Sequence, residues 1–574
     1  MERIIGIAAA PGLASGKLHL VGEVELTIPE HKSTDPEAEI SRLVAARAKA
    51  AKDLAALKEQ VLKGKAASEA EIFEAHLMIL EDESILSEAE TAIRAGENAE
   101  KAWMDASEMI AGMLEQLDDA TLSARAADIR DVGRRVLAAL LGVESSGLEL
   151  QEPVVIAGRD LTPSDTASVD QTKALAFVTA EGGPTSHTAI LAKAYGIPAI
   201  VGLGEKLLHL PQGTLMLVDG SSGEVVVDPD QASLDAFKLR FAQAQDAKGK
   251  ALSEAMGPAI TLDGVQVEVV ANIGGAADAR RAIENGAEGV GLFRTEFLYL
   301  DRDNKPTLEE QTQAYRETFE IMRGKPVVVR TLDIGGDKFI PYLNFPTELN
   351  PFLGWRGVRM LNGQEDLTVD QIKALLTASG DTDLRVMVPM ISGLAEVRAM
   401  QALIKRVRAE LEAQGVQVTG KFQFGTMVEV PSAAILADRM ALELDFFSIG
   451  TNDLTQYTLA VDRTNSQVAH LGNALDPAVL YLIQRTIDAA HNAGKWCGMC
   501  GELAGEPLAW AILLGMGLDE FSMAPARIPS AKQVLRQLDS ADCKELAMDA
   551  LKAGTAAEVE ALAKAYYASK GISV

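Results

Sequence analysis

A histidine stands at the start of a predicted helix, directly after a glycine-rich turn. Residues 182–193 read GGPTSHTAILAK. Gly-Gly-Pro interrupts regular structure, and Thr185 or Ser186 is a suitable N-cap for the Ala-rich helix that follows. His187 therefore belongs to the first turn, where free backbone N–H groups and the helix dipole favour an anion. A neutral imidazole there could attack phosphorus. The simpler alternative is a polar surface histidine.

Polar side chains also follow the ends of several apolar, β-branched segments in the second half of the chain. A single residue of this kind is usually a salt bridge or a rim charge, but several strand ends carrying such groups together indicate a reactive site. The groups are Arg294 to Glu296, Arg330 to Asp333, Glu429, Gly450 to Asp453 and Cys500 to Glu502, with Asp337, Lys338, Trp355, Arg356, Asp462 and Arg463 in adjoining loops.

The arginines in this set suit a phosphorylated carboxylate. A guanidinium holds phosphate and carboxylate oxygens in a bidentate fashion and stays charged at any working pH. Arg294, Arg330 and Arg463 are therefore predicted to bind the substrate.

The remaining groups suit the breaking of a phosphate ester. Glu429 and Asp453 are hard oxygen ligands for a Mg²⁺ ion that takes its other ligands from water and substrate. Such an ion would neutralise charge as the P–O bond breaks. Cys500 is a candidate acid, able to give a proton to the methylene carbon of an enol.

Composition limits the kinds of partner. The 574 residues include 82 Asp and Glu against 54 Lys and Arg, a formal net charge of −28, which argues against nucleic acid and anionic membranes. No apolar run approaches the ~18 residues of a membrane span. Three cysteines are too few for a disulfide scaffold, so a reducing cytoplasm is expected. Cys497 and Cys500 form a CxxC without a second ligand pair, so zinc binding and redox chemistry are disfavoured.

The first half of the chain predicts an α/β domain interrupted by helices. Residues 3–8 and 16–21 are predicted to form a hairpin that joins a later sheet. Residues 35–141 have helical composition and spacing throughout. Strands are then predicted at 154–157, 174–179, 199–201, 215–218 and 225–227, and residues 231–255 are predicted to form a connecting helix.

The second half predicts a barrel, because apolar strands alternate with amphipathic helices. Eight strands meet the requirement of a (β/α)8 barrel. They are expected at 267–273, 289–293, 327–330, 384–390, 424–428, 446–449, 496–499 and 520–523.

Several motifs resemble one family closely. The segment around His187, followed by GIPAIVG, resembles the phosphohistidine signature of the phosphoenolpyruvate-utilising enzymes. The segments GLFRTEFLY, RTLDIGGDK, MVEVPSAA, SIGTNDLTQY and CGMCGELAG also match that family. Over essentially the whole chain the resemblance is to the Enzyme I family of the bacterial sugar phosphotransferase system.

The resemblance implies a multidomain α/β fold. A swivelling phosphohistidine domain would comprise residues 1–21 and 145–230, and residues 22–144 would form an inserted helical bundle. A linker helix at 231–255 would lead to a TIM-type barrel at 256–574, which would bind phosphoenolpyruvate and carry the contact of a homodimer.

The resemblance also implies roles for individual residues. His187 would take phosphate from phosphoenolpyruvate and pass it to the histidine of the phosphocarrier protein HPr, in the cytoplasmic first step of sugar uptake. HPr would dock on the bundle, where residues 73–82 and 125–131 resemble the docking insertion and His76 would be structural or interfacial. Phosphoenolpyruvate would be bound by Arg294, Arg330, Asn452, Asp453 and Arg463, with Mg²⁺ on Glu429 and Asp453 and Cys500 as proton donor.

Two alternatives remain at this stage. A pyruvate phosphate dikinase or phosphoenolpyruvate synthase shares the histidine and the barrel but needs a nucleotide-binding domain, and no ATP-grasp-like Gly-rich loop precedes His187. A regulatory paralogue would bind partners without catalysis, which the complete set of candidate residues disfavours.

Overall fold

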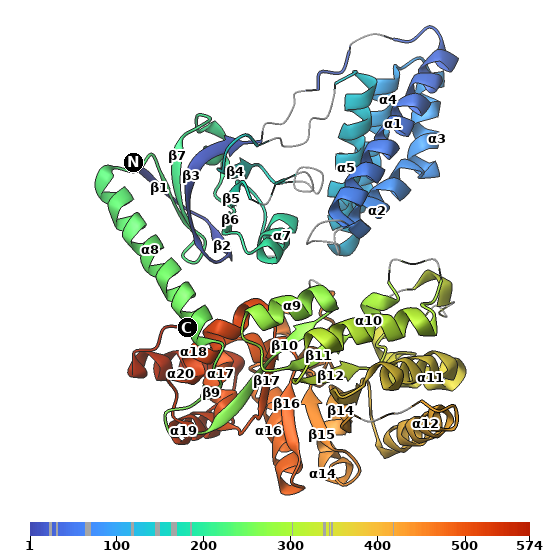
Figure 1. The fold of residues 1–574 in the computed structure, drawn as a ribbon. Coiled ribbons are helices and arrows are strands. Elements are labelled where there is room, and N and C mark those ends of the chain that lie inside the picture. The colour runs from blue at the N-terminus through green and yellow to red at the C-terminus, as the bar shows by residue number, and fades with distance from the viewer. Residues whose placement is uncertain are drawn as a thin grey trace. The chain divides into compact units, whose positions relative to one another are not determined.

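The computed structural model describes residues 1–574 except 22–25, 30–31, 63–69, 116–119, 144–149, 162–168, 171, 184–185, 301, 303, 337–339, 344, 346–347, 417, 419 and 466. The chain divides into two compact units, Met1–Gln245 and Asp246–Val574, which Figure 1 shows in colours that run from blue to red along the sequence.

The first unit contains an eight-stranded mixed sheet in the order β1-β8-β7-β3-β4-β5-β6-β2. Strands β3 to β6 pair in parallel, and buried apolar side chains cover both faces of the sheet. The strands are β1 (Glu2–Ile5), β2 (Ile7–Ala10), β3 (Leu13–Leu20), β4 (Val154–Gly158), β5 (Ala174–Thr179), β6 (Ala199–Val201), β7 (Leu215–Asp219) and β8 (Glu224–Val227).

The hairpin predicted for residues 3–8 and 16–21 is wrong. The first segment breaks at Gly6 into β1, which pairs with β8, and β2, which pairs with β6 at the opposite edge of the sheet. A Cβ atom at Gly6 would lie only 2.7 Å from the carbonyl oxygen of Val201, so a glycine is needed where the chain crosses so closely. Strand β3 pairs with β7 and β4 instead.

Helices occupy the segment between β3 and β4, as predicted. Their apolar stripes form a separate core that includes Leu54, Phe73 and Trp103, and the indole of Trp103 donates a hydrogen bond to the carbonyl of Gly133 at 3.1 Å. The helices are α1 (Pro36–Leu62), α2 (Ala70–Leu80), α3 (Glu83–Arg94), α4 (Ala99–Glu115) and α5 (Ala120–Leu140).

The second unit is a closed barrel of parallel strands, since β17 pairs with β10. All eight predicted strands are confirmed to within about two residues, the largest difference being β13, which stops before Pro389 and Met390. Proline has no N–H to donate, and Met390 has a φ of 61°. The strands are β10 (Gln266–Ile273), β11 (Val290–Arg294), β12 (Pro326–Arg330), β13 (Asp383–Val388), β14 (Phe422–Val428), β15 (Phe446–Ile449), β16 (Trp496–Met499) and β17 (Glu520–Met523).

Helices surround these strands, and a short strand β9 (Ala259–Ile260) pairs antiparallel with β10. Apolar residues from strands and helices form one large core. The helices are α9 (Ala276–Glu284), α10 (Leu308–Ile321), α11 (Leu361–Ala378), α12 (Leu394–Ala413), α13 (Pro431–Ile435), α14 (Ala437–Met440), α15 (Thr451–Leu459), α16 (Pro477–Asn492), α17 (Pro507–Gly515), α18 (Ile528–Leu535), α19 (Ser540–Ala550) and α20 (Ala556–Lys570).

Helix α8 (Gln231–Glu254) crosses the boundary between the units. Near its start, Phe237 is buried against Leu217 and Val226 of the sheet. Just beyond its end, the buried ammonium of Lys532 donates to the carbonyl of Ala255 at 2.9 Å, as well as to two glycine carbonyls. Each end of the helix is therefore fixed to a different unit.

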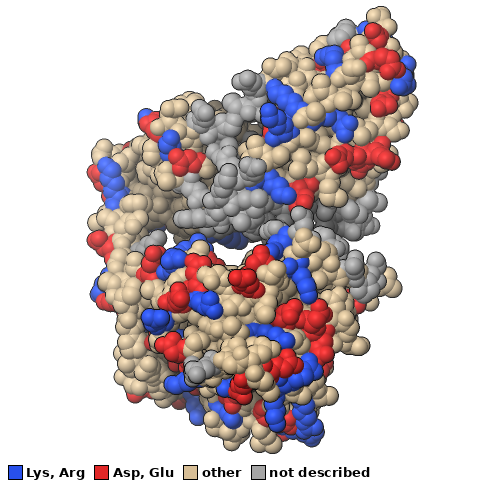
Figure 2. Space-filling model, turned by 45° about the vertical axis from the view of Figure 1, so that its right-hand side comes forward, with Lys and Arg blue, Asp and Glu red and all other residues tan. Residues whose placement is uncertain are grey.

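None of the helices in the described part of the chain is long and apolar enough to cross a membrane. Acidic and basic side chains are intermixed over the face that Figure 2 shows.

Candidate active site

His187 is the first residue of helix α7 (His187–Tyr195), and Ser186 is its N-cap, as predicted. The Ser186 hydroxyl accepts a hydrogen bond from the backbone N–H of Ala189 at 3.4 Å. The next residue, Thr188, is buried and donates to a carboxylate oxygen of Asp160 at 3.3 Å. Thr185 and the imidazole of His187 lie outside the described residues. The backbone of His187 thus has the N-terminal position that favours an anion.

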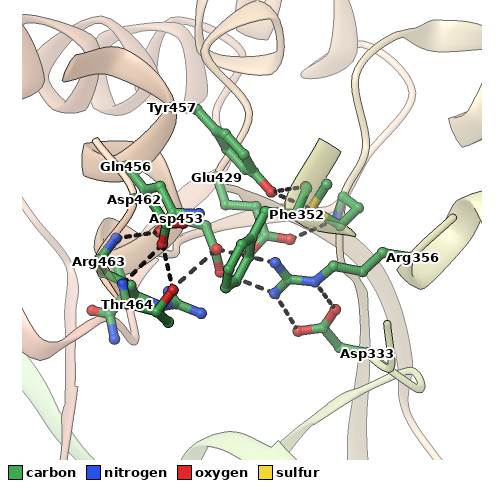
Figure 3. A network of polar contacts seen from close by, with 12 residues as sticks. Asp333, Phe352, Arg356, Glu429, Asp453, Gln456, Tyr457, Asp462, Arg463 and Thr464 are labelled. Atoms are coloured by element: carbon green, nitrogen blue, oxygen red, sulfur yellow. Dashed lines mark hydrogen bonds and ion pairs between the residues drawn. The ribbon is translucent and has the colours of Figure 1, made fainter. Parts of the chain in front are cut away.

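The strand-end residues of the second unit lie at the carboxyl-terminal end of the barrel. Figure 3 shows Asp333, Glu429 and Asp453 there, close to Arg356. Arg294 and Arg330 are the last residues of β11 and β12, and Glu429 directly follows β14. The remaining predicted residues follow β15 and β16. Asn452 and Asp453 lie in the first turn of α15, Cys500 directly follows β16, and Arg463 lies in the loop after α15. Asp337 and Lys338 lie outside the described residues.

Arg356 links two of the carboxylates at this end. Its guanidinium donates to both oxygens of Asp333, at 2.9 and 3.0 Å, and to both oxygens of Asp453, at 3.1 Å each. Only 1% of the residue is exposed. Because buried charges require partners, this two-sided contact fixes Asp453 against the end of β12.

Asp453 is held from its other side by Arg463, whose Nη1 lies 3.3 Å from Oδ1. The backbone N–H of Arg463 donates to the side chain of Gln456 at 3.1 Å, and its guanidinium lies over the Phe352 ring, 5.3 Å from the centroid. Arg463 is about one-third exposed.

Arg330 is buried among acidic groups. One of its terminal nitrogens pairs with Glu296 and the other with Asp333 at 2.9 Å. Burial alone would lower the pKa of the guanidinium, but these two carboxylates together with Glu429 outweigh burial and raise the pKa above its ordinary value. Arg330 therefore keeps its positive charge, and its two ion pairs hold the guanidinium in one orientation.

Glu429 is a buried carboxyl that lies near other carboxylates. It is 1% exposed, and Oε1 accepts a hydrogen bond from the N–H of Met390 at 2.5 Å. Burial raises the pKa of the Glu429 carboxyl, as do Asp453 and Asp333, while Arg356 and Arg330 oppose them. A cation bound beside Glu429 and Asp453 would offset the repulsion between these two carboxylates, and their oxygens are of the kind that Mg²⁺ prefers. No cluster of three or more His, Cys, Asp or Glu side chains suited to a metal is present among the described residues.

The two cysteines of the CxxC face opposite sides of the barrel wall. Cys500 packs inside the barrel with Met427 and Phe446, whereas Cys497 lies in the core between strands and helices. They therefore do not form a redox pair. Burial raises the pKa of the Cys500 thiol to about 11, so the thiol keeps its proton at neutral pH.

Asn452 makes reciprocal contacts with Glu502. Its amide nitrogen donates to the Glu502 carboxylate at 3.3 Å, and its amide oxygen accepts from the Glu502 N–H at 2.9 Å. This pairing joins the loops that follow β15 and β16.

Sequence reasoning assigned no role to Glu296, Asp333 or Arg356, although it noted their polarity. Glu296 and Asp333 lie next to strand ends, so their proximity to Arg330 could have been inferred from the parallel register. Arg356 lies between two short 3-10 helices and is distant in sequence from every barrel strand end. No periodic pattern in the sequence identifies it as a residue of the site.

Comparisons with known proteins identify the class. Residues 5–125 match the family described as PEP-utilising enzyme, N-terminal, residues 150–223 match PEP-utilising enzyme, mobile domain, and residues 248–540 match PEP-utilising enzyme, PEP-binding domain. These matches, together with the barrel and its arginines, define a PEP-utilising enzyme.

Curated relatives narrow the class. The chain is 46% identical over 543 residues to a phosphoenolpyruvate-protein phosphotransferase of Priestia megaterium, covering 94% of this chain and 95% of that protein. The proteins of the same name from Enterococcus faecalis and Haemophilus influenzae are each 44% identical, covering 98% and 97% of this chain and 99% and 98% of their own lengths. The chain belongs to the phosphoenolpyruvate-protein phosphotransferase family of transferases. The resemblance to Enzyme I and the predicted fold class are confirmed, and the dikinase and regulatory alternatives are not favoured.

Proposed function

We propose that this protein transfers the phosphoryl group of phosphoenolpyruvate to His187 and then to the histidine of the phosphocarrier protein HPr, releasing pyruvate. The observation that best supports this function is the buried set of arginines and carboxylates around Arg330, Arg356 and Asp453, next to the protonated thiol of Cys500.

The substrate would be held by Arg294, Arg330, Asn452, Asp453 and Arg463. The guanidinium groups would bind phosphate and carboxylate oxygens. Glu429 and Asp453 would hold Mg²⁺, which, when bound, neutralises charge on the phosphoryl group.

The first half of the reaction transfers the phosphoryl group and then a proton. A nitrogen of the His187 imidazole attacks phosphorus, and the bond between phosphorus and the bridging oxygen breaks, which leaves the enolate of pyruvate. Cys500 gives its proton to the methylene carbon, and water restores the proton to the thiolate. Because Cys500 remains a thiol at neutral pH, its proton is available when the enolate forms.

The phosphohistidine would then meet the carrier protein. We propose that HPr docks on the helical bundle, where His76 of α2 lies 3.3 Å from Asp128 of α5 and holds together the two segments that resemble the docking insertion. His76 is completely buried, in keeping with a structural role.

The proposal extends to the domains and the setting. The phosphohistidine domain would comprise residues 1–21 and 145–230, the docking bundle residues 22–144, the linker helix residues 231–255 and the phosphoenolpyruvate-binding barrel residues 256–574. The barrel would form a homodimer, and the protein would act in the cytoplasm at the first step of sugar uptake.

The test is transfer of ³²P from labelled phosphoenolpyruvate in the presence of Mg²⁺, with and without purified HPr. His187→Ala should abolish labelling, whereas His209→Ala, at an exposed histidine of the same unit, should leave it intact. The label should survive alkali and be lost in acid, as a phosphohistidine requires. Labelling of the His187→Ala variant, or a label that is stable to acid, would overturn the proposal.

A further inference from the structure

A glutamine is completely buried between the barrel strands and helix α11. Gln371 has no exposed surface, and its neighbours on the helix are mostly buried apolar residues such as Ile372 and Leu375. A polar side chain is costly at such a position unless its donors and acceptors are paired. The contacts of Gln371 therefore indicate what the residue does.

Gln371 forms hydrogen bonds with the segments that follow β11 and β12 and with helix α10. Its Oε1 accepts from the backbone N–H of Leu332 at 2.8 Å. Its Nε2 donates to the Thr295 hydroxyl at 2.9 Å and to the Tyr315 hydroxyl at 3.2 Å. Because the Leu332 N–H can only donate, it fixes which end of the amide is the oxygen.

The Thr295 hydroxyl continues this chain of contacts. It donates to the carbonyl of Arg330 at 2.9 Å while it accepts from Gln371. One amide and one hydroxyl thus connect the segment after β11 to the segment after β12.

Strand pairing ends where these contacts begin. The last paired residues of β11 and β12 are Arg294 and Arg330. The next residues include Glu296 and Asp333, which form the ion pairs of Arg330. Strand pairing between β11 and β12 stops at Arg294 and Arg330, so the side chains of Gln371 and Thr295 add a connection between these segments to that of the Arg330–Glu296 ion pair.

We propose that Gln371 is a positioning residue for phosphoenolpyruvate binding, which with Thr295 fixes the segments that follow Arg294 and Arg330 and so orients the guanidinium of Arg330 through Glu296 and Asp333. The inference rests on the proposed function, in which these two arginines bind the substrate. Loss of the amide would let the segments after the two strands shift, and a shift of about 1 Å in a binding group can lower kcat/KM by as much as roughly a hundredfold.

The experiment compares the full-length chain with Gln371→Met, Thr295→Val and the double variant. Gln401→Met is the matched control, because Gln401 lies on α12 and donates to the carbonyl of Glu443, a contact that does not involve β11 or β12. The wild type must first be labelled on His187 by [³²P]phosphoenolpyruvate. If it is not, the proposed function fails rather than this inference.

Each single variant should raise the KM for phosphoenolpyruvate roughly tenfold or more and lower kcat by less than threefold. The double variant should be no worse than the more impaired single one, because both substitutions break the same connection. Gln401→Met should keep the KM of the wild type. If Gln371→Met does not fold, as judged by circular dichroism, Thr295→Val carries the test because it removes only one hydroxyl.

Three results would overturn the inference: an unchanged KM in the variants that fold, additive effects in the double variant, or an equal rise in KM for Gln401→Met.

Discussion

The thiol of Cys500 differs from that of Cys497 only in its surroundings. Both are buried, and burial raises the pKa of each. Only Cys500 faces the barrel interior, where Arg330 and Arg294 lie close enough to act on it electrostatically.

Replacement of Cys500 by alanine should lower kcat by about 10²–10⁴-fold and leave phosphoenolpyruvate binding nearly unchanged, because an acid that acts on the enolate contributes mainly to the transition state. Cys497→Ala, the matched control, should keep most of the activity. Steady-state kinetics and calorimetric titration with phosphoenolpyruvate measure the two effects. Equal losses in both variants would indicate that the CxxC is structural.

Glu429→Gln should raise the Mg²⁺ concentration needed for half-maximal transfer, because the amide is a weaker ligand than the carboxylate. Asp453→Asn should do the same and also weaken the contacts with Arg356 and Arg463. Titration of activity with Mg²⁺ measures the shift, with Glu284→Gln, an exposed residue of the barrel, as the control. An unchanged Mg²⁺ requirement in both site variants would contradict their role as ligands.

At the scale of elements, much of the architecture could be predicted because it depends on local patterns. The barrel strands are mostly apolar runs, and polar residues such as Arg330 and Glu429 mark their ends. The break at Gly6 could not be predicted, because its cause is the approach of β6 almost two hundred residues later. Similarly, nothing near Arg356 reveals that it pairs with Asp453, since the contact depends on how two distant loops meet.

The opposite, amino-terminal end of the barrel carries another buried acid. Glu520, the first residue of β17, is 1% exposed. Arg385 of β13 is 3.8 Å from it, and the same guanidinium is 3.9 Å from Glu268 of β10. Burial, followed by Glu268 and Asp519, raises the pKa of Glu520 to about 8, and Arg385 opposes the shift.

This raised pKa predicts a loss of stability with rising pH. In the unfolded chain the Glu520 carboxyl ionises near its ordinary pKa of 4.5, whereas in the folded protein it keeps its proton up to a pKa of about 8. The protonated carboxyl therefore contributes its full stabilisation below pH 4.5, and this contribution falls as the pH rises from 4.5 to 8. The side chain of Glu520→Gln stays neutral at every pH. Between pH 5 and pH 8.5 the free energy of unfolding of this variant should therefore rise, relative to that of the wild type, by more than about 1 kcal/mol. Urea unfolding of both proteins, with Glu284→Gln as control, tests this. A difference that does not change with pH would contradict it.

At the scale of the whole molecule, His187, the proposed phosphoryl acceptor, and the proposed binding site of its donor belong to different compact units. Helix α8 has one end fixed to each unit. Residues 251 and 255, near its C-terminal end, are buried, and Lys532 of the barrel binds the carbonyl of Ala255. The natural boundary is therefore between residues 245 and 246, within the helix.

Division of the chain at this boundary should separate the two half-reactions. A fragment of residues 1–245 should exchange phosphate reversibly with phosphorylated HPr but should not be labelled by phosphoenolpyruvate. A fragment of residues 246–574 should bind phosphoenolpyruvate in the presence of Mg²⁺. Labelling assays and calorimetry measure these activities, with the intact chain as the reference. Labelling of the first fragment by phosphoenolpyruvate alone would refute the assignment of the two half-reactions to different units.

The insertion of the bundle between β3 and β4 has a consequence during synthesis. Among the described residues, the bundle core and the side chains packed against it lie between Ile40 and Leu140, so the bundle can close soon after this segment leaves the ribosome. Strand β1 must wait for β8, since Glu2 pairs with Val227. The first strands to be made are thus among the last to find their neighbours, and the nascent chain folds from the inserted segment outward.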